Sequence, residues 1–273
     1  MPHTVDEVNR AIESLWPIDT AESWDAPGLL SGDPAAQVEH IHLAVDAVPD
    51  TVDEAIALGA GLLLVHHPLL LRGVTSVAED RYKGVVLARL IRAGIALVAA
   101  HTNADIVDTG TSGVLATRLG LSEVRGLNGR IGRVGRLAEP VPLGRLAALL
   151  GEILPPTAGG IRVSGEFTAP ITTVALCGGA GDSYLADAAA VRADVYITSD
   201  LRHHPASEFR ESARLSGGPA LIDVSHWASE WLWLDVAASE LRAALPGVTV
   251  TVSDLRTDPW DFVVVQSHDI GKV

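Results

Sequence analysis

Apolar and polar positions along the chain follow two kinds of pattern, and each pattern predicts a different element. Short apolar runs bounded by Gly, Pro or Asp predict buried strands, and apolar residues spaced three and four apart predict amphipathic helices. The first helix is expected after Thr4, which with Glu7 can form a capping box, and Val8 and Ile12 belong to its apolar stripe. The expected strands are 41–47, 61–67, 95–101, 172–179, 194–200, 219–226, 248–254 and 261–267, and the further helices are 51–59, 82–94, 111–120, 143–154, 182–193, 205–217 and 227–245.

Strands and helices alternate along most of the chain, which predicts an α/β fold with parallel βαβ units and helices on both faces. The stretches 125–142 and 155–170 are less regular and contain Gly, Arg and Pro. We therefore expect two α/β lobes with mostly parallel strands, formed by residues 1–124 and 125–273. The last helix and strands are expected to pack back on the first lobe. Ligands of such folds bind in the cleft at the C-terminal ends of the strands.

Composition narrows the class of protein. A chain of 273 residues that is 48% hydrophobic can bury a sizeable core, and its formal net charge of −14 argues against a general nucleic-acid-binding surface. The single cysteine, Cys177, excludes an internal disulfide and cysteine-rich zinc sites, which fits a reducing cytoplasm. The N-terminal stretch has no signal-peptide pattern, and no apolar run is long enough to cross a bilayer. The expectation is a cytoplasmic protein without membrane binding.

Polar side chains stand where several of the predicted strands end. These residues are His66, His67, His101 and His226, together with Asp200, which precedes the pair His203 and His204. Because the crevice beyond the carboxyl ends of parallel strands is where ligands bind, histidines gathered there are better site candidates than scattered ones.

Three short motifs bring imidazoles and carboxylates to these strand ends: HHP at 66–68, HTNAD at 101–105 and DVSHWASE at 223–230. His101 and Asp105 are four residues apart, as are His226 and Glu230, so each pair shares one face if a helical turn forms. Taken singly, each motif also fits a structural role, as exposed loop histidines, a polar turn or a capped helix start. Their joint occurrence favours a shared site.

The donor set indicates a metal centre. Three or four imidazoles with two carboxylates suit Zn, Mn, Fe or Ni, and the oxygen donors are too few for a dedicated calcium site. Five candidate ligands exceed what one tetrahedral ion needs. Two divalent ions that share a bridging carboxylate account for the number, and Asp105 and Glu230 are the candidate bridges.

The order and spacing of HHP, HTNAD and HWASE resemble the signature of the NIF-three-like family, also called the dinuclear-metal-centre hexameric proteins or type 2 GTP cyclohydrolase I. The stretches AESWDAPGLLSG, VALCGGAGDSY and YITSDLRHH extend the resemblance over nearly the whole chain. The sequence differs from the family pattern at Ala26, where Asn is common, and at Ser199, where Gly is common. The resemblance implies five metal ligands and two residues near the metals: His66, His67, Asp105, His226 and Glu230 as ligands, and His101 and His204 close by.

The same resemblance implies a function. A dinuclear hydrolase of this family opens the purine imidazole ring of GTP with loss of formate, carries two divalent ions per subunit and assembles as a homohexamer. His101 or His204 would transfer protons there. Two alternatives remain open: a non-enzymatic, metal-binding oligomeric scaffold or regulator, and a dinuclear phosphoesterase that acts on nucleotides.

Three other features have simpler interpretations. The GGAG stretch at 178–181 lacks the Gly-Lys-Ser/Thr of a phosphate-binding loop and favours a tight strand-to-helix turn. Trp227 and Trp231 share one face of the last helix and are expected in the core or at a subunit interface. The arginines expected on a solvated surface are Arg130, Arg133 and Arg136.

Overall fold

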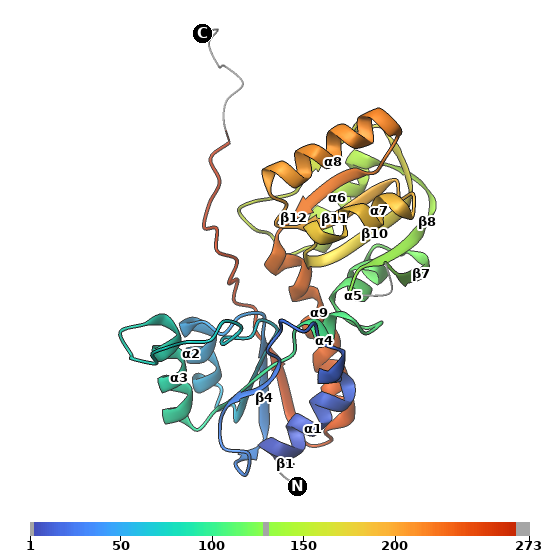
Figure 1. Ribbon diagram of the computed structural model, residues 1–273. Coiled ribbons are helices and arrows are strands. Elements are labelled where there is room, and N and C mark those ends of the chain that lie inside the picture. Colours follow the sequence, from blue (N-terminus) through green and yellow to red (C-terminus); the bar gives the residue numbers. More distant parts are fainter. Residues whose placement is uncertain (1–2, 128–130, 266–273) are drawn as a thin grey trace.

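The computed structural model describes residues 3–127 and 131–265, which form two lobes stacked one above the other (Figure 1). The first lobe has a five-stranded sheet of order β13-β4-β5-β6-β2, and the second lobe has a six-stranded sheet of order β7-β8-β10-β11-β12-β9. A short antiparallel pair, β1 (His3–Thr4) and β3 (Gln37–Val38), lies beside the first sheet. The predicted fold class, two α/β lobes, is confirmed.

The first sheet is parallel except at one edge, and its strands are β4 (His40–Ala44), β5 (Leu62–Val65), β6 (Ala96–Ala99), β13 (Thr249–Val252) and the antiparallel β2 (Gly28–Ser31). Helices cover both of its faces. One face holds α2 (Pro49–Ala57) and α3 (Tyr82–Ala93), and the other holds α1 (Val5–Leu15) and α9 (His226–Ala244). Strands buried on both faces are apolar at every position, which explains the unbroken run before His66.

The second sheet combines a parallel centre with antiparallel edges. Its strands are β10 (Pro170–Ala180), β11 (Val195–Ser199) and β12 (Ala220–Val224), which are parallel, and β7 (Ser122–Gly126), β8 (Arg133–Pro142) and β9 (Arg162–Ser164). One face packs on α7 (Leu185–Ala190) and α8 (His203–Ser216), and the other on α5 (Thr111–Arg118), α6 (Leu143–Ile153) and α9. Three single turns complete the elements: η1 (Ile18–Thr20), α4 (Thr102–Asp105) and η2 (Asp182–Tyr184).

Helix α9 joins the two lobes. Its residues contact β10 and β11 of the second sheet and also α1, β4 and β13 of the first lobe. Trp233 of this helix packs edge-on against Trp16, with ring centroids 5.0 Å apart. Strand β7 spans the proposed boundary at residue 125, and the exact position of that boundary stays a prediction.

Two segments differ from the sequence-based expectation. Residues 133–142 form a ten-residue strand, although the stretch contains Gly, Arg and Pro, because its backbone pairs antiparallel with β10. Residues 261–265 belong to no strand despite their β-branched composition, and 266–267 lie outside the described residues. Phe262 is 80% exposed, since no strand within residues 3–127 and 131–265 pairs with this stretch. Among the helices of the described part, none has the length and apolar character needed to cross a membrane.

Candidate metal centre

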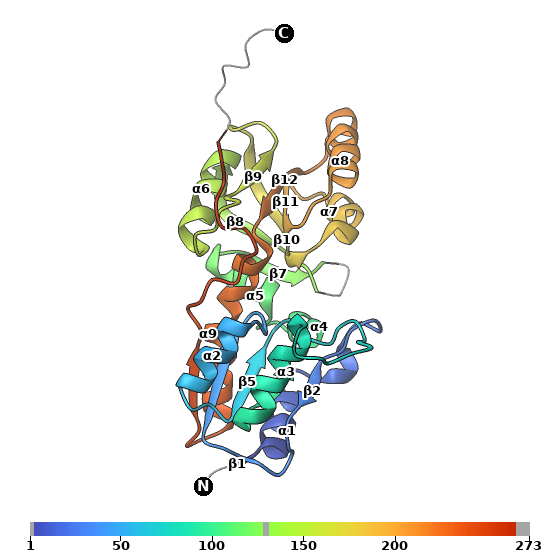
Figure 2. The same ribbon diagram turned by 90° about the vertical axis from the view of Figure 1, so that its left-hand side faces the viewer.

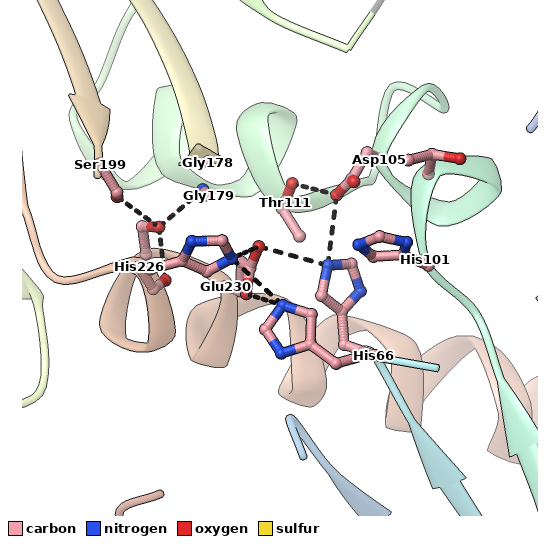
Figure 3. Close-up of polar contacts among 12 residues, drawn as sticks. His66, His101, Asp105, Thr111, Gly178, Gly179, Ser199, His226 and Glu230 are labelled. Atoms are coloured by element: carbon pink, nitrogen blue, oxygen red, sulfur yellow. Dashed lines mark hydrogen bonds and ion pairs between the residues drawn. The ribbon is translucent and has the colours of Figure 1, made fainter. Parts of the chain in front are cut away.

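Histidines and carboxylates from both lobes meet at the waist of the molecule. His66 and His67 directly follow β5, His101 follows β6, and Asp105 ends the single turn α4. The opposite side comes from the first two turns of α9, which carry His226 and Glu230 (Figure 3). Ser225 caps this helix by accepting a hydrogen bond from the Ala228 amide at 3.2 Å, so α9 begins at His226.

Glu230 lies at the centre of the cluster. Its Oε2 is 2.9 Å from Nε2 of His67, and its Oε1 is 2.9 Å from Nε2 of His226 and 3.5 Å from Nε2 of His66. The Nε2 atoms of His67 and His226 are 3.1 Å apart, and Oδ1 of Asp105 is 3.7 Å from Nε2 of His66. Donor atoms that share one ion at ~2.1 Å lie ~3.0–3.5 Å apart, so these spacings suit metal coordination.

Every histidine of the cluster is held through Nδ1 by a separate acceptor. The partners are Ala100 O for His66 (2.9 Å), Asp46 Oδ1 for His67 (2.7 Å), Asp25 Oδ1 for His101 (2.8 Å) and Asp200 Oδ2 for His226 (2.8 Å). This arrangement fixes the tautomer and leaves each Nε2 with its lone pair for the centre. Metal-binding histidines are oriented in the same way.

A cation resolves two polar conflicts in this geometry. Nε2 of His66 is fully buried and has no hydrogen-bond partner among the described residues. Nε2 of His67 and Nε2 of His226 face each other at 3.1 Å, where two lone pairs or two protons repel and only a single proton or a cation between them is favourable. Buried polar atoms of this kind need a partner, and divalent ions would supply one to these nitrogens. The donor set therefore fits a metal.

The close packing of imidazoles around one carboxylate also shifts the pKa values of the metal-free cluster. Burial opposes charge on Glu230, but His226, His67 and His66 outweigh it and hold the carboxyl pKa well below its usual range. Burial lowers the pKa of His67, but Glu230 and Asp46 together outweigh it and raise this pKa to about 10. The pKa of His226 also lies well above normal. These shifts favour protonated imidazoles around an ionised Glu230 in the metal-free protein. Burial raises the pKa of Asp105.

Asp105 is fixed from the second lobe's side. Thr111 donates a hydrogen bond to its Oδ1 at 2.5 Å. Arg133 donates to the carbonyls of Ile106 and Val107 at 2.9 and 2.6 Å, which holds the loop that follows Asp105. The prediction that Arg133 lies on a solvated surface is wrong, because the carbonyls of this loop bind its guanidinium in the interior. Arg136 is exposed, and Arg130 lies outside the described residues.

The GG pair at the end of β10 makes room for the cluster. A Cβ on Gly179 would lie 2.3 Å from Oε1 of Glu230, and the φ of Gly179 is +67°. The amide of Gly179 donates to Ser229 at 2.9 Å, one residue before Glu230 (Figure 3). This stretch does end a strand before a turn, as expected, but its glycines also allow the close approach of the carboxylate.

The structure brings six of the seven sequence-predicted residues together. These are His66, His67, His101, Asp105, His226 and Glu230, and His66, His67 and His101 themselves form one group of metal-binding geometry. His204 is exposed at the start of α8, where its ring contacts His203 at 5.3 Å between centroids. The individual roles of all seven residues stay predictions.

Two carboxylates that orient the histidines were absent from the sequence-based site. Asp46 is the last residue but one of the predicted strand 41–47, so the strand-end rule that selected the histidines also applies to it. Asp25 lies in a loop with no periodic signal, and only the resemblance marks its surroundings. The side chain of Asp25 is buried, and although burial opposes its ionisation, the hydrogen bonds from His101 and Thr102 lower its pKa to about 2.

The fold and the cluster define a class: a two-lobed α/β protein with a buried His/carboxylate site at the waist that can hold metal. The family model described as Duf34/NIF3 (NGG1p interacting factor 3) matches residues 3–259, and the chain belongs to this family. A protein of Streptomyces coelicolor named GTP cyclohydrolase 1 type 2 homolog is 46% identical, with 94% of this chain and 93% of that protein covered. A protein of Mycobacterium tuberculosis with the same name is 33% identical, with 97% and 98% covered.

Solved structures agree with the fold. A Bacillus cereus protein related to NIF3 matches with a TM-score of 0.86 at 22% identity, covering 96% of this chain and 99% of that one. A hypothetical protein of Staphylococcus aureus matches with a TM-score of 0.86 at 26% identity, covering 96% and 100%. The two-lobed layout is therefore shared with other members of the family.

Proposed function

We propose that this protein is a dinuclear metal-dependent hydrolase that binds two divalent ions, of Zn, Mn, Fe or Ni, in each subunit. The observation that carries the proposal is the position of Glu230, whose two oxygens contact three imidazoles from two different elements. A carboxylate in this position can serve two ions at once. His66 and Asp105 form one side of it, and His67 and His226 form the other.

We propose GTP as the substrate, with opening of the purine imidazole ring and release of formate, because the curated relatives are named GTP cyclohydrolase 1 type 2 homolog. Bound divalent ions would supply a Lewis acid and an acidified water. The chain itself contributes His101, whose Nδ1 is bonded to Asp25, so its Nε2 can accept and return a proton at the substrate. His204, on the exposed start of α8, is the second candidate for proton transfer. A homohexamer is the proposed assembly.

The test is incubation of the purified, metal-loaded protein with GTP, followed by product analysis. Formate and a dihydroneopterin triphosphate are the expected products. Free phosphate or a nucleoside would indicate a phosphoesterase instead. A lack of turnover with Zn, Mn, Fe and Ni alike would contradict the hydrolase proposal and favour a metal-binding scaffold.

A further inference from the structure

A cavity of about 430 Å³ adjoins the metal centre, between the end of the second sheet and the C-terminal stretch of the chain. Its walls include Arg162, Asp223, His226 and, from the C-terminal stretch, Asp258 and Trp260. We call it the tail cavity. Both overall views show the red C-terminal stretch leaving the waist and running beside the second lobe (Figures 1 and 2). Small-molecule sites commonly have this size.

The C-terminal stretch is tied down on both sides of the cluster. Thr257 donates to Oδ2 of Asp46 at 2.5 Å, and the other oxygen of Asp46 orients a histidine of the first lobe. Ser225, the N-cap of α9, donates to Oδ2 of Asp258 at 2.5 Å, and Oδ1 of Asp258 accepts from the Trp260 amide at 3.1 Å. These bonds hold Trp260 at the cavity wall.

The tail cavity offers a flat apolar face and a buried acceptor. Trp260 is 68% exposed, an unusual state for the largest apolar residue unless its ring has a partner. Oδ1 of Asp223 is buried without a well-formed hydrogen bond among the described residues. Burial raises the pKa of this carboxyl, although Arg162 and the backbone of Leu201 oppose the rise. An aromatic ring that carries N–H groups satisfies both features, by stacking on Trp260 and donating to Asp223.

A second cavity of about 420 Å³ lies on the other side of the Arg162–Asp223 ion pair, against α8, and we call it the α8 cavity. It is lined by Arg162, His203, Ser207 and Arg210. Arg162 binds Asp223, and Arg210 lies 3.1 Å from the exposed carboxylate of its neighbour Glu211. Each guanidinium has further N–H donors beyond these contacts, and guanidinium groups match phosphate oxygens in geometry.

We propose that the tail cavity and the α8 cavity form one binding site for a phosphorylated heteroaromatic ligand. The ring stacks on Trp260 and donates to Asp223, next to His226, and the phosphates extend past Arg162 to Arg210. This assignment rests on the proposed function, and it names the residues that would select the substrate of the proposed hydrolase. It also gives His203 a place at the ligand.

The test compares binding of GTP, guanosine and inorganic triphosphate to the metal-loaded full-length protein, by calorimetry and tryptophan fluorescence, with chromatography to show that GTP stays intact. We expect Trp260→Ala to weaken GTP and guanosine about tenfold or more, and Trp260→Phe to retain most of the affinity. Arg210→Ala should weaken GTP and triphosphate about tenfold and leave guanosine unchanged. Arg214→Ala, on the same helix but not in the wall of the α8 cavity, is the matched control.

Wild-type affinity in both Trp260→Ala and Arg210→Ala overturns the proposal, as does loss of guanosine binding in Arg210→Ala. The emission of Trp260 is taken as the difference between the spectra of the wild type and of Trp260→Phe. If this emission is blue-shifted before any ligand is added and changes on dilution, a second copy of the chain covers the tail cavity, which also overturns the proposal. The two proposals fail separately. If GTP binding depends on Trp260 and Arg210 as expected but GTP is not turned over, only the hydrolase proposal is contradicted. If GTP is turned over with an unchanged KM in Trp260→Ala and Arg210→Ala, only the proposed binding site is contradicted.

Discussion

Nε2 of His67 and Nε2 of His226 lie 3.1 Å apart, although 159 positions separate the two residues in the sequence. Each ring is held from behind by its own aspartate, Asp46 for His67 and Asp200 for His226. Neither ring can turn its Nε2 away without breaking that bond. The fold thus keeps two nitrogen donors at a separation that a shared cation, or a proton on one of the rings, makes favourable, and the predictions below follow from this constraint.

Removal of the central carboxylate should empty the site. Glu230→Gln keeps the size of the side chain but removes the charge that three imidazoles contact, so metal content by elemental analysis should fall to less than half of the wild-type value. Asp235→Asn, an exposed position on the same helix, is the control and should bind metal normally. Full metal content in Glu230→Gln would show that the carboxylate is not a ligand.

The aspartates that bind Nδ1 of the ligand histidines should also contribute to metal affinity. Asp46→Asn weakens the bond to Nδ1 of His67, and we expect metal affinity to fall about 10–100-fold, as measured by competition with a chromophoric chelator. Asp50→Asn, exposed at the start of α2, should have no effect. If the two variants bind metal equally well, the orientation of His67 does not depend on Asp46.

Thr257→Val tests whether the C-terminal stretch supports the centre. The substitution removes one hydrogen bond to Asp46 and keeps the shape of the side chain, so a smaller loss of metal affinity is expected, about three- to tenfold. The same chelator competition measures it. An unchanged affinity would mean that Asp46 keeps its position without this contact.

Gly179→Ala separates backbone strain from steric conflict. The new Cβ would meet Oε1 of Glu230 at 2.3 Å, and the positive φ adds about 1–2 kcal/mol of strain. Gly59→Ala has a similar φ of +65° and no atom near its Cβ, so it should lose stability only. Thermal unfolding should show both losses, and elemental analysis should show loss of metal in Gly179→Ala alone. Normal metal content there would disprove the conflict with Glu230.

The pH dependence of the metal-free protein follows from the raised pKa of His67. The folded chain holds this proton up to about pH 10, whereas an unfolded histidine loses it near pH ~6.5. The resulting stabilisation is complete below pH ~6.5 and disappears as the pH rises toward 10. Urea unfolding of chelator-treated protein should show this decline, and His67→Asn should reduce it.

Metal binding should have the opposite pH dependence. Ions must displace these protons, so loading releases protons and apparent affinity rises with pH. Calorimetry in buffers of different ionisation enthalpy counts the protons released. Binding without any proton release would show that the imidazoles are already neutral before metal arrives.

Much of the site followed from local sequence pattern. A run such as LLLV predicts a buried parallel strand, and residues directly after such strands share one edge of the sheet, which selected His66, His67 and His101. The four-residue spacing of His226 and Glu230 placed both on one side of α9, because helical neighbours are set by the chain itself. These inferences needed only contacts between residues that are close in sequence.

Other features depended on partners far away in sequence. Residues 133–142 form a strand because β10 lies beside them. Residues 261–265 form none, because no strand in the described part of the chain lies beside them. The burial of Arg133 depends on carbonyls of the loop after α4, which no property of an arginine-rich stretch reveals.

The sequence by itself determined which residue types reach the strand ends and the start of α9, since period and capping are local properties of the chain. Only the tertiary structure decided that Asp46, Asp25 and Asp200 stand behind the histidines, and that Gly179 leaves space for Glu230. These relationships join segments from different strands and lobes, and long-range packing, rather than local preference, sets the distances between them.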